Sequence, residues 1–228
     1  MDSDRRVGVV VGLAAEARIA RRLRWRVAIG GGTAPGAEAA ARRLIDDGCE
    51  ALVSFGLAGG LDPALRPGAL VVPAAVILPD GKRCPTDPGL ARLLGGASAQ
   101  VVAGAGAIVA NREDKRHLHG RTAAAATDLE SGAVARVAAE YGVPFAVLRA
   151  ICDPAERDLP PAAAGALDAH GAIAIGRLIG SIVARPAQLP ALLALAADAA
   201  AARRALIARV RQIVQAQGSA LLRLATLR

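Results

Sequence analysis

Aromatic side chains are nearly missing from this sequence. They make up 2% of its 228 residues, as two Phe, one Trp and one Tyr. Proteins that bind single-stranded nucleic acid stack bases on aromatic rings, so this class is not expected. Lysine is also scarce, with Lys82 and Lys115 against a large number of arginines. We attribute this bias to composition and predict no nucleic-acid partner. The formal net charge of +8 still favours smaller anions, such as phosphate, or an acidic membrane surface.

Cysteines are few, and long apolar runs are absent. Cys49, Cys84 and Cys152 are odd in number and have no metal-site spacing, which favours free thiols in a reducing compartment. The apolar run starting at Val7 stops at Gly12, too short for a secretory signal. No run reaches the ~20 residues of a membrane-spanning helix. We expect a cytoplasmic protein, with peripheral contact at the inner membrane face as an open alternative.

Short apolar runs alternate with helical patterns along much of the chain, which is 54% hydrophobic. The pattern predicts strands over residues 7–11, 26–29, 51–55, 70–78 with a break at Pro73, 100–102, 107–110 and 145–151. It predicts helices over residues 14–23, 36–47, 129–140, 162–184 and 188–228. This alternation is typical of an α/β fold, a three-layer α/β/α sandwich around a mixed, largely parallel sheet. We expect a catalytic domain over 1–185 and an amphipathic helical C-terminal extension over 186–228.

The C-terminal extension differs from the rest of the chain in its charge. Arginines are frequent after Pro186, and Asp198 is the sole acid there. Leu206, Val210, Ile213 and Val214 form an apolar stripe at helical spacing. This stripe could pack on the body of the protein or on a second subunit. Alternatively, its leucines and arginines could lie on an anionic membrane surface.

Residues able to carry chemistry follow several of the predicted strands. Glu16, Gly30–Gly32, Gly56–Gly60 and the Cys152–Asp153 pair each come just after a strand, and Glu130 opens a helix. The carboxyl ends of parallel strands form the ligand-binding edge of such a sheet, so these residues can meet in one cleft. Three carboxylates and glycine-rich turns would then share a site.

Cleavage of a nucleoside bond needs these residue types. The leaving base must be protonated, which a carboxylic acid with a raised pKa can do. The ribose becomes an oxocarbenium-like cation that a nearby carboxylate stabilises. A phosphate nucleophile needs backbone amides and a cation. Asp153, Glu130 and the glycine turns with nearby arginines meet these needs.

Several motifs resemble the superfamily of purine nucleoside phosphorylases and methylthioadenosine/adenosylhomocysteine nucleosidases. The paired signature is TDLESGA at 127–133 and LRAICD at 148–153. A glycine motif, SFGLAGGL at 54–61, and the opening segment at 8–16 are also similar, and the likeness spans roughly residues 7–183. Within the superfamily, the chain looks most like the hopanoid-associated phosphorylases, which act on adenosylhopane.

The resemblance implies a function and roles for particular residues. Asp153 would act at N7 of the base, Glu130 would bind the ribose hydroxyls, and Glu16 would lie near the ribose or the nucleophile. The residues expected to bind the rest of the substrate are Gly56, Ala58, Gly59, Leu129 and Cys152. Those expected to bind phosphate are Gly31, Gly32 and Thr33. No metal or organic cofactor is expected.

The expected activity is release of adenine from an adenine nucleoside, adenosylhopane, in hopanoid lipid biosynthesis. The acceptor would be phosphate or water, and a homo-oligomer is expected. One alternative is a soluble nucleosidase for methylthioadenosine or adenosylhomocysteine. Another is a non-catalytic nucleotide- or lipid-binding module, because Ala15, Ala17 and Leu57 depart from the family pattern. Glu130 could instead serve only the helix dipole, and Asp153 could be only a turn residue.

Overall fold

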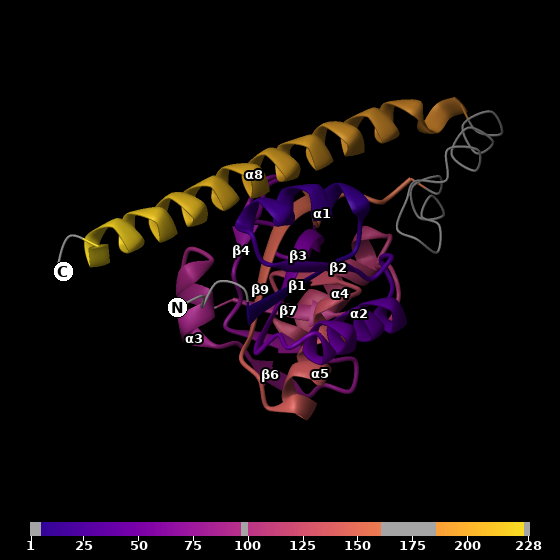
Figure 1. The fold of residues 1–228 in the computed structure, drawn as a ribbon. Helices are drawn as coiled ribbons and strands as arrows, with labels where there is room; N and C mark the ends of the chain where they lie inside the picture. The colour runs from indigo at the N-terminus through magenta and orange to yellow at the C-terminus, as the bar shows by residue number, and fades with distance from the viewer. Residues whose placement is uncertain (1–5, 97–99, 161–185, 226–228) are drawn as a thin grey trace.

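A nine-stranded mixed sheet forms the centre of the protein (Figure 1). The structure is a computed structural model that describes residues 6–96, 100–160 and 186–225. Strand order is β2-β1-β3-β8-β7-β5-β6, and β9 pairs with β3 and β4 outside this path. The strands are β1 (Val7–Val11), β2 (Arg26–Ile29), β3 (Ala51–Gly60), β4 (Leu70–Val71), β5 (Ala75–Ile77), β6 (Arg83–Pro85), β7 (Val101–Gly104), β8 (Ala126–Asp128) and β9 (Phe145–Asp153).

Most strand pairs are parallel, as the sequence predicts. The parallel pairs are β1–β2, β1–β3, β3–β9, β5–β7 and β7–β8. The antiparallel pairs are β3–β8, β4–β9 and β5–β6. Strand β3 joins the two halves of the sheet, because it pairs with β1 and β9 along most of its length and with β8 at its end.

Helices cover both faces of the sheet, which confirms the predicted three-layer arrangement. The helices are α1 (Ala14–Ala20), continued by the 3₁₀ turn η2 (Arg21–Leu23), α2 (Ala34–Asp46), α3 (Pro88–Leu93), α4 (Arg112–Thr122), α5 (Ser131–Tyr141), and α8 (Leu189–Ala225), preceded by the turn η3 (Pro186–Gln188). One core cluster joins the sheet to α1, α3 and α8, and another joins the opposite face to α2 and α5.

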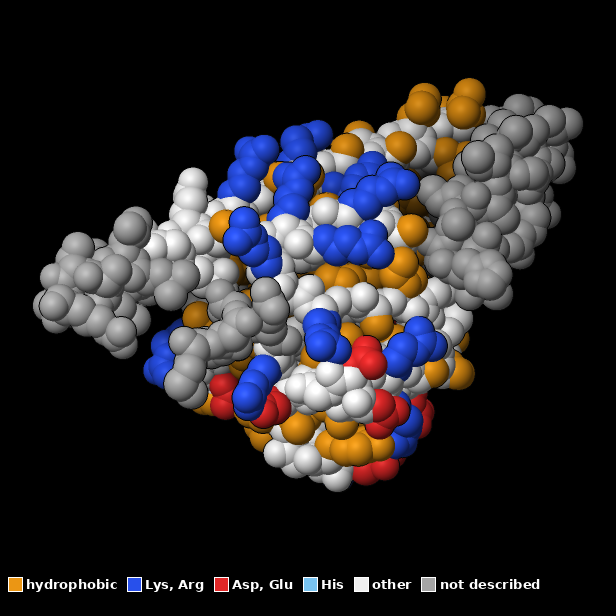
Figure 2. All heavy atoms as spheres, viewed as in Figure 1, with side chains coloured by type: hydrophobic (Ala, Val, Ile, Leu, Met, Phe, Trp, Pro, Cys, Tyr) orange, Lys and Arg blue, Asp and Glu red, His pale blue; other side chains and the backbone are white. Residues whose placement is uncertain are grey.

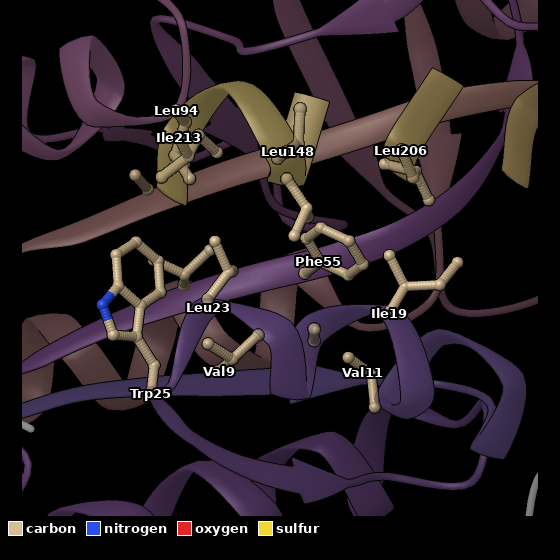
Figure 3. Packing of buried hydrophobic residues seen from close by; sticks show 14 of the residues in the cluster. Val9, Val11, Ile19, Leu23, Trp25, Phe55, Leu94, Leu148, Leu206 and Ile213 are labelled. Carbon is tan, nitrogen blue, oxygen red and sulfur yellow. The ribbon is translucent and has the colours of Figure 1, made fainter. Parts of the chain in front are cut away.

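The valines of β1 illustrate how the two cores form. Val9 and Val11 belong to the cluster beneath α1 and α8, whereas Val10 belongs to the cluster beneath α2 and α5. Successive side chains of a strand point to opposite faces, so a continuous valine run suits a strand buried on both sides. Figure 3 shows Val9 and Val11 near Phe55, with Leu206 and Ile213 of α8 closing the cluster from above.

Helix α8 packs along the body of the protein through one of its faces. Ala202, Leu206, Val210 and Ile213 are buried in the core cluster that also contains Ile19 of α1. Val214, expected in the same stripe, is instead 37% exposed, because adjacent helical residues point about 100° apart. Among the described residues, no helix is both long and apolar enough to cross a membrane.

Two predicted strands were wrong in their details. The strand expected at 51–55 continues to Gly60, because β9 and β8 supply pairing partners that override the weak strand preference of glycine. The segment 70–78 is two strands, β4 and β5, separated around Pro73, in agreement with the predicted break. Residues 107–110 are irregular rather than a strand, and their apolar side chains line a cavity instead of entering a sheet. The helix expected over 162–184 lies outside the described residues.

Candidate active site

A cavity of about 450 Å³ opens at the carboxyl ends of β3 and β9, the edge at which the sequence predicts a site. Its acidic lining residues are Glu16, Asp128, Glu130 and Asp153. The rest of the wall is mostly apolar and includes Leu192, Leu195, Ala196 and Ala199 of helix α8. The cavity therefore combines convergent carboxylates with an aliphatic wall, and its size suits a small-molecule ligand.

Glu16 is held by three backbone N–H groups. Its Oε2 accepts hydrogen bonds from Gly12 N at 3.0 Å and Leu13 N at 2.8 Å. Its Oε1 accepts one from Leu57 N at 2.7 Å, which ties the start of α1 to strand β3. The carboxylate reaches back to the residue before its helix, as acidic residues at this helical position often do. Glu16 thus has a structural role in addition to its place in the cavity wall.

Two glycines allow the carboxylates to approach the backbone closely. A Cβ atom at Gly12 would lie 2.4 Å from Glu130 Oε1. A Cβ atom at Gly56 would lie 2.5 Å from Glu16 Oε1 and 2.8 Å from Arg149 Nη1. Both positions are therefore restricted to glycine as long as the acidic groups keep their places. Gly56, predicted to bind substrate, is not part of the cavity lining and instead makes room for Glu16 and Arg149.

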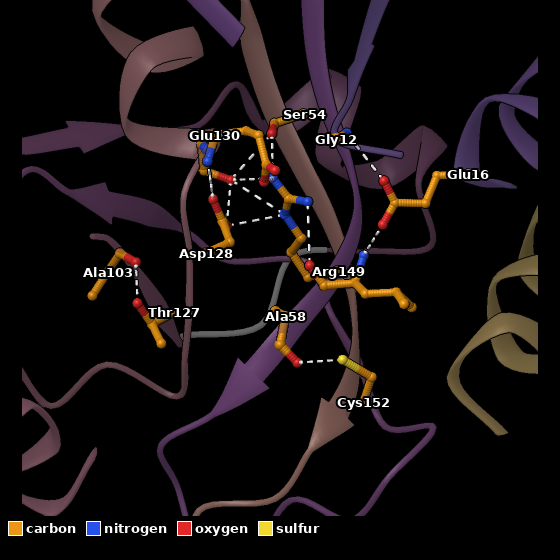
Figure 4. Close-up of polar contacts among 12 residues, drawn as sticks. Gly12, Glu16, Ser54, Ala58, Ala103, Thr127, Asp128, Glu130, Arg149 and Cys152 are labelled. Atoms are coloured by element: carbon orange, nitrogen blue, oxygen red, sulfur yellow. Dashed lines mark hydrogen bonds and ion pairs between the residues drawn. The ribbon is translucent and has the colours of Figure 1, made fainter. Parts of the chain in front are cut away.

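Arg149 lies at the centre of the acidic group (Figure 4). Its guanidinium Nε is 3.0 Å from Asp128 Oδ2, and its Nη2 is 3.1 Å from Glu130 Oε2. Nη2 also donates to Ser54 Oγ at 2.7 Å. Arg149 is 1% exposed, so these ion pairs are shielded from water. The arginine fixes the position of Glu130 from beneath the cavity.

Asp128 fixes the start of helix α5. Its Oδ1 accepts hydrogen bonds from Glu130 N at 2.9 Å and Ser131 N at 2.6 Å. Its Oδ2 accepts one from Ser131 Oγ at 2.6 Å. The side chain of Glu130 makes no helix-capping hydrogen bond. Asp128 therefore satisfies the helix end and leaves the Glu130 side chain available to the cavity.

The acidic group holds more carboxylates than cations. Burial, opposed by the charge of Arg149 and assisted by the nearby carboxylates of Asp128 and Glu16, raises the pKa of Glu130 to about 7. Burial also raises the pKa of Glu16, although Arg149 and three backbone N–H groups oppose the change. Because Arg149 alone cannot neutralise three buried carboxylates, the group holds a proton near neutral pH.

Asp153, at the end of β9, forms a second buried ion pair in the cavity wall. Lys115 Nζ donates to Asp153 Oδ2 at 2.5 Å and to the carbonyl oxygens of Pro154 and Arg157. Asp153 Oδ1 is buried and has no hydrogen-bond partner in the described part of the chain. Burial raises the pKa of Asp153, although Lys115 opposes the change. Asp153 is thus anchored through one oxygen, while the other has no partner among the described residues.

Cys152, predicted to bind substrate, lines the cavity. Burial raises the pKa of its thiol to about 12. Its Sγ donates to the carbonyl oxygen of Ala58 at 3.6 Å. A thiol with so high a pKa carries almost no thiolate at neutral pH, so Cys152 is a wall residue and not a nucleophile.

The structure places the other predicted residues in different ways. Ala58, Gly59 and Leu129 line the cavity together with the three predicted catalytic carboxylates. Of the residues expected to bind phosphate, Gly32 lines the cavity, whereas Gly31 and Thr33 are not part of its wall. The hydroxyl of Thr33 accepts a hydrogen bond from Gly36 N and caps helix α2. The phosphate assignment therefore depends on Gly32 and remains a prediction.

Several lining or supporting residues were not predicted from the sequence. Lys115 is one of two lysines in an arginine-rich chain, and that rarity was the only available signal. Asp128 belongs to the TDLESGA motif, but no role was predicted for it. The aliphatic wall of Ile108, Val109, Leu159 and α8 carried no signal, because these residues are ordinary core types. Within the described ranges, no cluster of three or more His, Cys, Asp or Glu side chains is arranged to hold a metal ion.

The fold and the family of the chain follow from comparison with known proteins. A family model described as the phosphorylase superfamily matches residues 18–184. The chain belongs to this superfamily, which confirms the resemblance noted in the sequence. It is an enzyme of the nucleoside phosphorylase and nucleosidase class, and its general reaction is cleavage of a nucleoside N-glycosidic bond. No curated protein matches the chain.

Solved structures share this fold at low sequence identity. The Helicobacter pylori 5′-methylthioadenosine/S-adenosylhomocysteine nucleosidase with butyl-thio-DADMe-Immucillin-A has a TM-score of 0.65 at 18% identity, covering 91% of this chain and 98% of that one. Futalosine hydrolase of the same species has a TM-score of 0.60 at 19% identity, covering 65% and 88%. An S-adenosylhomocysteine nucleosidase from Streptococcus pyogenes, in complex with 5-methylthiotubericidin, has a TM-score of 0.60 at 15% identity, covering 83% and 94%. These likenesses establish the common fold.

Proposed function

We propose that this enzyme releases adenine from an adenine nucleoside with a large apolar 5′ group, adenosylhopane. The main support is Asp153, which lines the cavity and has one oxygen anchored by Lys115 and the other without a described partner. A buried polar atom without a partner needs an explanation, and a bound base would supply one. In this proposal, Asp153 holds the base at N7.

Departure of adenine requires that the C1′–N9 bond breaks and its electron pair moves to the base. A proton at N7 makes the base a better leaving group. Asp153 can carry that proton because burial raises the pKa of its carboxyl group. Lys115 opposes the change in pKa and holds the carboxyl group in place. Asp153 therefore serves as the acid, and Lys115 fixes the orientation of its carboxyl group.

Glu130 takes the ribose in this proposal. Arg149 fixes its Oε2, and the side chain lines the cavity. An ionised carboxylate there binds the ribose hydroxyls and stabilises the positive charge that develops at C1′. The buried acidic group has surplus negative charge, which a cationic ribose would partly neutralise. The stabilisation is thus larger in the transition state than in the bound substrate.

The aliphatic wall supports an apolar 5′ group. Leu192, Leu195 and Ala199 of α8 line the cavity, together with Ile108 and Val109. Burying a hydrocarbon against such a wall contributes roughly 25 cal/mol per Å². A charged amino-acid tail, as in adenosylhomocysteine, suits this aliphatic part of the wall less well, because leucine and valine side chains give its charges no partner. A hopane body agrees with the wall, and the resemblance to hopanoid-associated phosphorylases independently implies it.

The acceptor is phosphate or water. Arg203 is the basic residue on the described cavity wall, and at Gly32 the missing side chain lets a ligand come close to the backbone. A guanidinium and a glycine turn suit a phosphate oxygen, which would form the new bond to C1′. Attack by water would give a free ribosyl product. Glu16 already accepts three backbone hydrogen bonds, so its action on the nucleophile remains open to test.

An adenine-release assay tests the proposal. Purified enzyme is incubated with adenosylhopane or with methylthioadenosine, each with and without inorganic phosphate. Faster release from adenosylhopane, with a phosphorylated ribosyl product, supports the proposal. Preference for methylthioadenosine would favour the alternative nucleosidase function, and no release from either would favour a non-catalytic binding module.

A variant of the aliphatic wall sharpens this assay. Leu195→Gln should raise KM for adenosylhopane roughly tenfold, because a polar group replaces part of the apolar wall. The same change should alter KM for methylthioadenosine much less, since its 5′ group is small. Equal effects on both substrates would contradict the placement of the 5′ group against α8.

A further inference from the structure

We infer that α8, α1 and the turn η2 together form a docking surface for an anionic phospholipid bilayer. The surface is defined by Leu189, Leu193, Arg204 and Arg211 of α8 and by Arg18, Arg21, Arg22 and Arg24 beside it. All of these side chains are exposed. Figure 2 shows Lys and Arg side chains gathered over α8 and α1, with acidic side chains confined to the lower part of this view. The inference stands independently of the proposed substrate.

The outer face of α8 carries both arginines and leucines. At about 3.6 residues per turn, positions 193, 204 and 211 lie on one line, because their separations are about three and two turns. Leu193 is 63% exposed, and Leu189, one turn earlier, is 47% exposed. Arg204 points about 200° away from the buried Leu206, so this line faces away from the body. The inner apolar stripe of α8 is therefore buried in the core, while its outer face presents both leucines and arginines to solvent.

A second basic segment lies beside this face. Arg18 belongs to α1, and Arg21 and Arg22 belong to η2, both of which contact α8. These arginines and those of α8 are far apart in the sequence, and packing of Ile19, Leu23 and Leu206 in one core cluster brings them together. In the sequence, the excess of arginine is concentrated in the C-terminal segment. The fold adds four arginines to the two on the outer face of α8.

None of these arginines forms an ion pair with a described carboxylate. The sequence has no acidic residue between Glu16 and Glu38. Asp198 of α8 forms its ion pair with Arg157. Exposed arginines without partners favour an external anion, and each contributes about fivefold to binding at an anionic membrane surface. The exposed leucines add the apolar contact that a peripheral helix inserts among lipid acyl chains.

Other partners fit this surface less well. A two-fold dimer through this face would place like charges opposite one another, since both copies present the same patch. Nucleic acid would leave Leu189 and Leu193 without an apolar partner. A bilayer matches both the charge and the leucines. The cavity lies beneath the same helix, because Leu192 and Leu195 line it from the other side of α8.

Co-sedimentation with vesicles tests the inference on the full chain without any nucleoside. Vesicles of phosphatidylcholine are compared with and without phosphatidylglycerol, at low and high salt. We expect binding only with phosphatidylglycerol, weakened by salt. The double variant Arg204→Gln/Arg211→Gln should lower the binding constant more than tenfold. Leu189→Ser/Leu193→Ser should lower it roughly tenfold without changing the charge.

A matched control separates this surface from net charge. Arg43 on α2 and Arg116 on α4 are exposed and have no described ion pair, so Arg43→Gln/Arg116→Gln removes equal charge elsewhere. This control should bind vesicles like the unmodified chain, and thermal melting should show all variants folded. Absence of vesicle binding, equal loss in the control, or binding to duplex DNA but not to vesicles would overturn the inference. Failure of adenine release would leave these outcomes unchanged.

Discussion

Lys115 and Asp153 form an ion pair of 2.5 Å between Nζ and Oδ2, although 38 residues separate them in the sequence. Lys115 is fully buried and also donates to two backbone carbonyl oxygens. Helix α4 therefore holds the end of β9 at the cavity. The pair leaves Asp153 Oδ1 without a described partner, and this is the atom through which we expect the base to be bound.

Replacement Asp153→Asn should remove most of the activity. Asparagine cannot pass a carboxyl proton to N7, so kcat should fall by roughly 10²- to 10⁴-fold in the adenine-release assay. The variant also leaves Lys115 buried without its counterion, so a thermal melt must accompany the assay. Asp46→Asn, on the exposed surface of α2, is the matched control. Full adenine release by the folded Asp153→Asn variant would exclude this role.

Glu130 should control the acid limb of the pH profile. Its pKa is raised to about 7, and the proposed mechanism needs its ionised form. The value of kcat/KM should therefore rise as the pH increases toward about 7. In Glu130→Gln, the residual activity should be low and should lack this limb. A limb of unchanged position in the variant would assign it to another group.

The same carboxyl group should affect stability with the opposite trend. Between the ordinary glutamate pKa of 4.5 and the raised pKa of about 7, the folded state keeps this proton, whereas the unfolded state loses it. The free energy of unfolding should therefore fall as the pH rises through that window. Urea denaturation at a series of pH values measures this, and Glu130→Gln should show a flatter profile. A steeper fall in the variant would contradict the assignment.

Gly56→Ala should disturb the acidic group from within strand β3. The added Cβ would lie 2.5 Å from Glu16 Oε1 and 2.8 Å from Arg149 Nη1. We expect a loss of about 1–3 kcal/mol in the free energy of unfolding, together with reduced activity. Gly120→Ala in α4 is the control, since nothing lies within 4 Å of its added Cβ. Equal stability of the two variants would show that Glu16 and Arg149 can move without cost.

Helix α8 should contribute to stability through its inner stripe. Leu206 is fully buried beneath the helix, so Leu206→Ala should cost about 2–5 kcal/mol. Leu193 is 63% exposed on the same helix, and Leu193→Ala should change stability by less than about 0.5 kcal/mol. Urea denaturation compares the two. Similar small effects would mean that the helix is not part of the folded core in solution.

The sequence predicts the sheet best where apolar runs are continuous. The bounds of β1 and β2 agree with the predicted ranges, because valine-rich runs ending at glycine or a turn leave few alternatives. The short strands β6 and β8 were missed, as were α3 and α4. A three-residue strand carries almost no periodicity, and its pairing depends on partners that are distant in the sequence. Helix α4 is strongly polar and has one buried residue, Lys115, so no apolar stripe marks it.

Only the site residues that lie in sequence motifs could be predicted. Glu16, Glu130 and Asp153 do line one cavity, which follows from their places at strand and helix ends. The residues that shift the pKa values of these carboxyl groups could not be predicted from the sequence, because an ion pair such as Lys115 with Asp153 depends on three-dimensional packing. The wall formed by α8 could not be predicted either, since periodicity shows that a helix has an apolar face but not which surface that face meets.

Helix α8 serves the cavity and the core with one continuous face. Leu195 and Ala199 line the cavity, and Ala202 and Leu206, one and two turns later, are buried in the core. Because the wall residues and the core residues share one helix, a large shift of the wall would disturb the packing of the core. Filling the cavity should therefore raise the melting temperature of the whole chain, by an amount that depends on ligand concentration and affinity. Thermal shift then becomes a direct way to rank nucleosides by their 5′ group, even for analogues that the enzyme cannot cleave.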